Sequence, residues 1–138
     1  MTTVTARAAR VKLPKVYLGS SMANMARVRD LNEQLRELGL DVVSTWAAEP
    51  PDRIARVAAI ADARELLSAD MVVIDTTVPS STGGWHSEIG LALASGKTLA
   101  IVGPCTNIFA ELATQKFYDW EECFAWLRLV VQVEKVLG

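Results

Sequence analysis

Residues that carry several common chemistries are scarce in this chain of 138 residues. His86 is the single histidine, which argues against a histidine-rich metal centre. The two cysteines, Cys105 and Cys123, form neither a CxxC pair nor a Cys/His metal spacing. We therefore expect no metal, and two ordinary thiols in a protein of the reducing cytoplasm.

Basic charge and long apolar runs are also lacking. The formal net charge is -2, and no cluster of lysine and arginine provides the basic face that a phosphate backbone requires, so nucleic acid is not expected as a partner. No apolar run reaches about 18 residues, so no membrane span is expected. What the chain has instead is 51% apolar residues, which suits one globular domain with one core.

The N-terminal segment differs from the rest of the chain. Residues 1–14 carry basic side chains without an apolar block, which is not the pattern of a secretory signal. We expect a disordered tail there, with an organelle-targeting segment as the alternative. Residues 15–138 then form a single domain, because no linker or repeat divides them.

Short apolar runs alternate with segments of helical periodicity along this domain. Strands are predicted at residues 15–19, 41–46, 70–75 and 97–103, with a last short strand or turn at 116–120. Helices are predicted at residues 25–39, 53–69, 85–96 and 121–137, with a short one at 106–114. This alternation predicts an α/β fold: a flavodoxin-like, doubly wound parallel sheet of five strands with helices on both faces.

A doubly wound sheet also predicts where a ligand binds. If the strand order is 2-1-3-4-5, the crevice at the switch point lies between the strands that end at Gly19 and Asp75. The loops at residues 19–24 and 76–84 would bound this crevice. The stretch STGGWHSEIG, residues 81–90, follows directly and leads into a helix.

Glu88 is the main candidate for chemistry in that stretch. It is expected in about the first turn of its helix, where the macrodipole favours a carboxylate. Acidic residues are common in first turns for structural reasons alone, and this is the alternative interpretation. In favour of a site, Gly83 and Gly84 allow a ligand to approach the backbone closely.

Three further residues have both a structural and a functional interpretation. Tyr17 lies within a predicted strand, so it is either a core residue or a hydroxyl that meets a carboxylate across the switch point. Asp62 interrupts an apolar helical stretch and is either an exposed acid or part of a site. Asp75 ends the central strand and is either a turn cap or a ligand contact.

The first loop is a possible phosphate site. Gly19, Ser20 and Ser21 lead into a helix that carries Arg27 and Arg29, and a glycine-serine turn at a helix N-terminus can bind a phosphate. The pattern lacks both the P-loop lysine and the GxGxxG spacing. Serine catalysis has little support, because there is no GxSxG motif and one histidine only.

Several motifs together resemble a known family. KVYLGSS, Asp62 followed by Asp70 and MVVID, and GGWHSEIGLALASGKTLAIVG look like the nucleoside 2-deoxyribosyltransferase superfamily, which includes the nucleoside 5′-monophosphate N-glycosidases. The resemblance spans about residues 15–128 and includes FYDWEECFAWL.

The resemblance implies an enzyme that cleaves or transfers a (deoxy)ribosyl group through a covalent glutamyl intermediate, without a cofactor. Glu88 matches the glutamate that attacks the anomeric carbon, and Tyr17 matches the tyrosine that positions it. Asp62 matches the aspartate that contacts the nucleobase in the transferases. The helix terminus and the Tyr17 hydroxyl would keep Glu88 ionised.

The chain departs from the family pattern at three positions near Glu88. Thr82 stands where the transferases usually carry a second acidic residue, so recognition of the base is expected to differ. Trp85 and His86 are also unusual in this loop. Trp85 could stack on a base or cover the helix start, and His86 could contact substrate or face solvent.

The closing helix, residues 121–137, is apolar on more than one stripe, and the resemblance implies homodimers or larger homo-oligomers. Burial of the helix within its own domain is the alternative. Three functions stay open: transfer to a second base, hydrolysis of a nucleoside 5′-monophosphate, and a non-catalytic nucleotide-binding module on the same fold. An electron carrier that binds flavin is disfavoured, because it would be coloured.

Overall fold

A computed structural model describes residues 12–80 and 83–138. Its centre is a parallel sheet of five strands in the order β2-β1-β3-β4-β5, as predicted. The strands are β1 (Lys15–Gly19), β2 (Asp41–Val42), β3 (Met71–Asp75), β4 (Thr98–Val102) and β5 (Gln115–Phe117). Most of the predicted tail, residues 1–14, lies outside the described residues.

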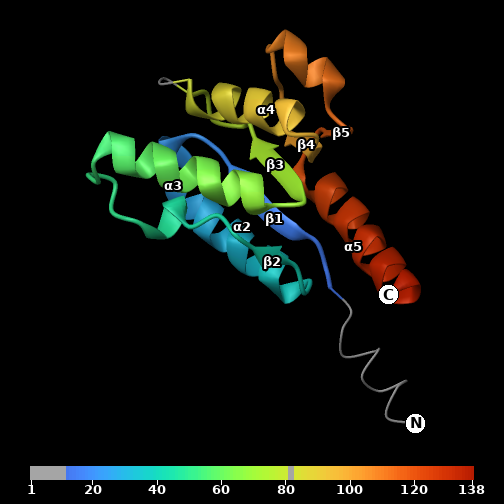
Figure 1. Cartoon of the computed structure of the whole chain (residues 1–138). Helices are drawn as coiled ribbons and strands as arrows, with labels where there is room; N and C mark the ends of the chain where they lie inside the picture. Colours follow the sequence, from blue (N-terminus) through green and yellow to red (C-terminus); the bar gives the residue numbers. More distant parts are fainter. Residues whose placement is uncertain (1–11, 81–82) are drawn as a thin grey trace.

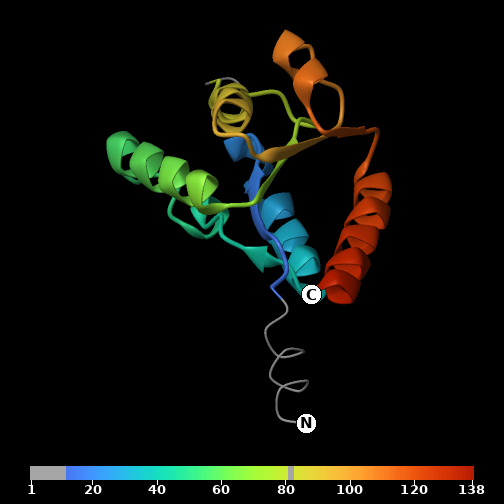
Figure 2. The same cartoon turned by 45° about the vertical axis from the view of Figure 1, so that its right-hand side comes forward.

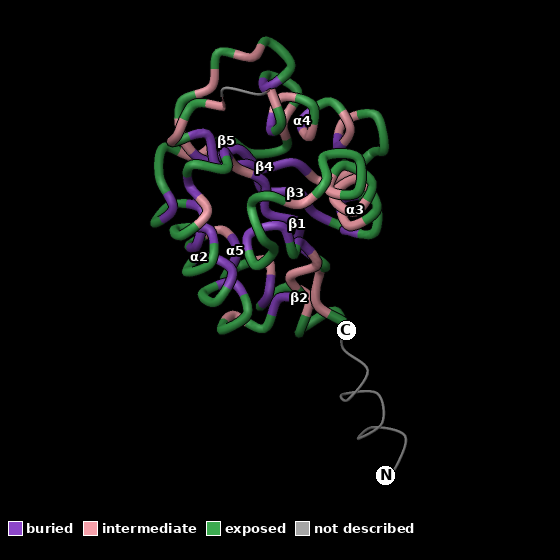
Figure 3. The backbone as a smooth tube through the Cα atoms, turned by 90° about the vertical axis from the view of Figure 1, so that its left-hand side faces the viewer, coloured by how far each residue is buried: buried purple, intermediate pink, exposed green. Residues whose placement is uncertain are grey.

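Helices cover both faces of the sheet (Figure 1). They are α2 (Met25–Glu37), α3 (Ala55–Ser68), α4 (Gly84–Ala94) and α5 (Trp120–Leu137). Figures 2 and 3 show α3 and α4 on one face and α2 and α5 on the other. No helix in the described ranges is both long enough and apolar enough to cross a membrane.

The core lies on both sides of the three central strands. All five residues of β3 are buried, and β1 and β4 are buried at four positions each. Parallel strands are covered on both faces by their crossover helices, which explains why these runs are continuously apolar. Figure 3 shows this buried band running through the sheet.

The second strand is shorter than predicted. The sequence favoured a strand over residues 41–46, but β2 ends at Val42 and the chain enters a 3-10 turn, η2 (Trp46–Ala48). Two side chains take over the pairing with β1. The Leu18 amide donates to the Ser44 hydroxyl at 3.0 Å, and the Trp46 indole donates to the Leu18 carbonyl at 2.7 Å.

Helix boundaries also differ from the prediction in places that matter for the site. Helix α3 begins at Ala55, so Arg53 belongs to the preceding loop. Helix α4 begins one residue earlier than expected, at Gly84. Two 3-10 turns complete the connections: η1 (Met22–Asn24) precedes α2, and η3 (Ile108–Leu112) replaces the short helix predicted between β4 and β5.

Candidate active site

The carboxylate of Glu88 lies against the end of β1. A Cβ atom placed on Gly19, the last residue of that strand, would be 2.9 Å from Oε1 and 3.0 Å from Oε2 of Glu88, and 2.8 Å from Cδ1 of Ile74. These distances are too short for a real side chain. Glycine at position 19 therefore makes the space in which the Glu88 carboxylate sits, at the carboxyl end of the sheet.

Tyr17 supplies the hydrogen bond to this carboxylate. Its side chain is buried, and its hydroxyl donates to Glu88. Burial and the neighbouring Glu88 charge raise the pKa of the Tyr17 hydroxyl far above its ordinary value, so it stays protonated and can act only as a donor toward the carboxylate. Tyr17 lies in β1 and Glu88 lies in α4, so a strand and a helix hold the two side chains in position.

The start of α4 depends on the glycine that precedes it. Gly83 has φ +77°, a left-handed conformation that suits glycine, and its carbonyl accepts from the Ser87 amide at 3.1 Å. Glu88 lies in the second turn of α4, and there is no acidic residue in the first turn. The expectation of a first-turn carboxylate is thus corrected, and the macrodipole acts less strongly on Glu88 because its effect falls off within a turn.

The charge state of Glu88 also differs from the expectation. Burial raises the pKa of Glu88 to about 7, while the hydrogen bond from Tyr17 lowers it and the nearby Asp62 charge raises it. Desolvation outweighs the hydrogen bond from the tyrosine, so the surroundings favour the protonated carboxyl instead of holding Glu88 ionised, as had been expected. Such a pKa suits a group that must lose its negative charge when it forms an ester.

A pocket of about 270 Å³ opens beside this carboxylate, between α3 and α4. Its volume is close to the lower end of the range for small-molecule sites. The polar groups in its lining are Asp62, Ser87 and Glu88, and the rest of the wall is small or apolar: Ala59, Ala63, Leu66, Gly84 and Leu91. Two carboxylates therefore face one cavity, with Tyr17 and Gly19 beneath one of them.

Asp62 is paired with an arginine that sequence analysis did not single out. The Arg53 guanidinium donates from Nη2 to Oδ1 of Asp62 at 3.0 Å. Burial raises the pKa of the Asp62 carboxyl, Arg53 lowers it, and Glu65 on the same helix raises it. Sequence spacing gave no signal for this pair, because Arg53 lies in a loop whose path the periodicity does not fix.

Other predicted contacts lie at the same end of the sheet but serve the fold. The Ser20 hydroxyl donates to the Asp75 carbonyl at 3.0 Å and accepts from Asn24, and the Ser21 hydroxyl caps η1 by accepting from Ala23. The Asp75 carboxylate is fully buried and accepts from the Thr77 amide and from the Trp120 indole, the latter at 2.8 Å. These groups link β1, β3 and α5, and they are absent from the lining of the pocket that holds Glu88.

The two arginines after the first loop lie away from Glu88. Arg27 is exposed and lines a groove between α2 and α5, together with Trp120. Arg29 donates from Nε to the Ala47 carbonyl at 2.7 Å, which ties α2 to η2. Neither arginine is among the residues that line the pocket beside Glu88.

Trp85 and His86, in the first turn of α4, pack against each other. Their rings stack with centroids 3.7 Å apart, and His86 Nδ1 lies 3.1 Å from Nδ2 of Asn107. Trp85 is buried, and its indole nitrogen has no partner within the described residues. Neither residue lines the pocket, and the predicted contact at Thr82 lies outside the described residues.

Solved structures share this fold. A 2-deoxyribosyltransferase from Bacillus psychrosaccharolyticus matches with TM-score 0.65 at 20% identity, over 82% of this chain and 95% of that chain. A conserved protein from Enterococcus faecalis V583 matches with TM-score 0.65 at 20% identity, over 87% and 98%. The CMP N-glycosidase BcmB of Clostridium botulinum matches with TM-score 0.57 at 21% identity, over 84% and 97%. No protein-family model and no curated protein matches the sequence.

Proposed function

We propose that this protein breaks the N-glycosidic bond of a nucleoside or nucleotide, with Glu88 as the nucleophile. The observation that carries the proposal is the placement of the Glu88 carboxylate, which rests over Gly19, accepts a hydrogen bond from Tyr17 and faces a pocket with Asp62. The shared fold supports it, because two of the solved structures are a 2-deoxyribosyltransferase and a CMP N-glycosidase.

The first step forms a covalent glycosyl-enzyme. An ionised oxygen of Glu88 attacks the anomeric carbon, the bond from that carbon to the base nitrogen breaks, and its electron pair leaves with the base. Positive charge develops on the sugar in the transition state, and the carboxylate stabilises it. The Tyr17 hydroxyl holds the attacking carboxylate in place, and Asp62 contacts the departing base.

The second step releases the sugar from Glu88. A second base attacks the anomeric carbon in a transferase, and water attacks it in a hydrolase; in both cases the ester bond breaks and Glu88 regains its negative charge. We favour transfer, because the resemblance over about residues 15–128 is to the transferase-like group. The phosphate-binding role of Ser20, Ser21, Arg27 and Arg29, on which a monophosphate hydrolase would depend, has less support, because Arg27 and Arg29 lie away from the pocket.

The experiment is a chromatographic screen of nucleosides and 5′-monophosphates, each with and without an acceptor base. We expect release of free base from at least one of them, and loss of this activity in Glu88→Ala. Glu88→Gln is the matched variant, because it keeps the shape of the side chain and cannot form the ester. A non-catalytic binding module would instead bind ligand without turnover and tolerate Glu88→Gln.

We also propose that the protein forms homo-oligomers. Helix α5 leaves large apolar side chains exposed at Leu129, Val133, Val136 and Leu137, and α3 does so at Val57, Ile60 and Leu67, with Ile54 exposed just before it. Exposed apolar side chains on a helix face are a feature of interfaces when they gather into a patch, and each of these two helices offers such residues. Light scattering on the eluting peak of a sizing column should give a multiple of 15.0 kDa, and a monomer at micromolar concentration would contradict the proposal.

A further inference from the structure

The ion pair between Arg53 and Asp62 is more buried than an ordinary surface pair. The side chains are 19% and 33% exposed, and the distance from Nη2 to Oδ1 is 3.0 Å. Solvated pairs gain little, whereas a partly desolvated pair is sensitive to the loss of either partner. Asp62 lines the pocket together with Glu88, whereas Arg53 contacts Asp62 and is not itself a lining residue.

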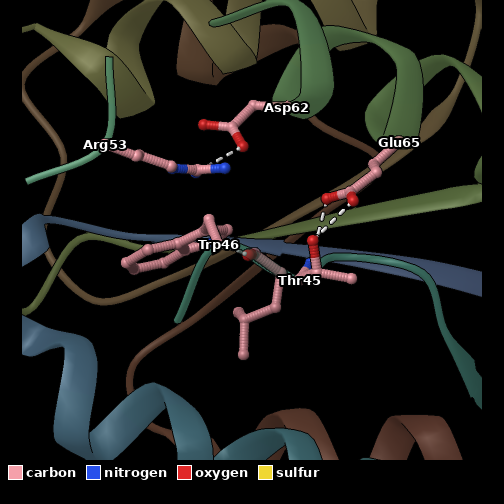
Figure 4. A network of polar contacts seen from close by, with 6 residues as sticks. Thr45, Trp46, Arg53, Asp62 and Glu65 are labelled. Carbon is pink, nitrogen blue, oxygen red and sulfur yellow. Dashed lines mark hydrogen bonds and ion pairs between the residues drawn. The ribbon is translucent and has the colours of Figure 1, made fainter. Parts of the chain in front are cut away.

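The loop that carries Arg53 is fastened to the strand beneath the site. Figure 4 shows the arrangement: Arg53 reaches Asp62, and one turn further along α3 Glu65 accepts from the Thr45 amide and hydroxyl at 2.9 and 2.7 Å. The Trp46 indole donates to the carbonyl of Leu18, which lies between Tyr17 and Gly19 in β1. These contacts fasten the segment that precedes the loop, at Thr45 and Trp46, to α3 and β1.

The charges around Asp62 show what the arginine does. Asp62 raises the pKa of both Glu88 and Tyr17, so its charge is felt across the pocket. Glu65 adds a further negative charge on α3, and the positive charge that lowers the pKa of Asp62 comes from Arg53. Without Arg53, the charges of Asp62, Glu65 and Glu88 would lie near one another with no cation paired to Asp62.

We propose that Arg53 is a positioning residue that pairs with Oδ1 of the Asp62 carboxylate and leaves Oδ2 directed to the substrate, so that the pocket selects nucleobases presenting an N–H donor. The inference rests on the proposed function of the pocket. An ionised carboxylate accepts hydrogen bonds only, so Asp62 does not supply the proton that the departing base finally takes. The base leaves with the electron pair of the broken bond and takes that proton from water.

The test measures binding in the Glu88→Gln background, where no turnover interferes. The probes are 2′-deoxyadenosine, 2′-deoxycytidine and 2′-deoxyuridine, each compared by calorimetry with an analogue lacking the donor: hydrogen in place of the amino group, or N3-methyl. We expect at least one pair to differ by about tenfold or more in Kd, the size of a hydrogen bond to a charged group. Arg53→Gln should reduce this ratio to near one, and Arg53→Lys should restore part of it.

Arg56→Gln is the matched control, because Arg56 is an exposed arginine in the first turn of α3, and it should keep the ratio. A second readout needs no ligand: the pKa of the Asp62 carboxyl, followed by NMR, should rise in Arg53→Gln. A ratio unchanged in Arg53→Gln, or no ratio in any pair, would overturn the inference. If turnover requires Glu88 and is unchanged in Arg53→Gln, the proposed function stands and the inference about Arg53 fails. If binding is selective and requires Arg53 but the wild type shows no turnover, the inference stands and the proposed function fails.

Discussion

At the scale of single residues, Tyr17 controls how readily Glu88 ionises. The hydrogen bond from the Tyr17 hydroxyl lowers the pKa of Glu88, against the larger effect of burial, which raises it to about 7. A nucleophilic carboxylate must be ionised, so kcat/KM should rise with pH through about 7.

Tyr17→Phe tests this relation. Removing the donor should raise the pKa of Glu88 further, so the acidic limb of the profile of kcat/KM against pH moves to higher pH. The rate at neutral pH should fall by about tenfold or more, and part of it should return at alkaline pH. A loss of rate that is equal at every pH would contradict the assigned role of the hydroxyl.

Sequence and resemblance together identified Tyr17, Glu88 and Asp62 as candidates, and the structure brings them around one pocket. Arg53 could not be found in this way, because its contact with Asp62 depends on a loop that leaves β2 early. Asp75 shows that a residue can match the pattern of a site and still have its side chain engaged within the protein. A carboxylate at the end of a central strand satisfies the pattern of a ligand contact, yet its oxygens are taken by Thr77 and Trp120.

At the scale of elements, a buried hydrogen bond joins the end of β3, next to the switch point, to the start of α5. The Trp120 indole donates at 2.8 Å to the Asp75 carboxylate, which is fully buried. Trp120→Phe keeps most of the ring but leaves Oδ2 of Asp75 without this donor. We expect a loss of about 1–3 kcal/mol in the free energy of unfolding, the cost of an unsatisfied buried group.

Trp126→Phe is the control for this prediction, since Trp126 lies on the same helix and packs beside Phe117 with ring centroids 5.5 Å apart. Urea denaturation should show a smaller loss for Trp126→Phe than for Trp120→Phe. Equal losses would mean that ring volume, and not the hydrogen bond to Asp75, accounts for the effect.

The elements themselves were largely predictable. Residues 15–19 match β1 at both ends, because a buried parallel strand reads as a short apolar run closed by glycine. The strand predicted at 41–46 ended at Val42, since Leu18 then pairs with side chains: its amide donates to the Ser44 hydroxyl and its carbonyl accepts from the Trp46 indole. Bonds of this kind depend on tertiary position, which hydrophobic periodicity does not encode.

At the scale of the whole molecule, burying Glu88 makes global stability depend on pH. The pKa of Glu88 is about 7 in the folded protein and 4.5 in the ordinary case, so the folded state binds this proton more tightly. The stability that it contributes is complete below pH 4.5 and is lost as the pH rises through about 7. A functional carboxylate in this position therefore lowers the free energy of unfolding at neutral pH.

Glu88→Gln removes this dependence, because the amide has no charge to desolvate. Relative to the wild type, it should gain free energy of unfolding as the pH is raised from about 5 to about 8. Urea melts at both ends of this range measure the gain, with Glu111→Gln, an exposed position, as the control. A difference between Glu88→Gln and the wild type that does not grow with pH would place the Glu88 carboxyl in solvent.

The most direct measurement of the central claim is the mass of the protein during turnover. Samples denatured rapidly during turnover, digested and analysed by mass spectrometry should contain a peptide that carries Glu88 with one added (deoxy)ribosyl group, because unfolding stops the second step before the sugar is released. The adduct should be missing in Glu88→Gln. Base release that continues in Glu88→Ala, or a sugar attached to any other residue, would contradict the account.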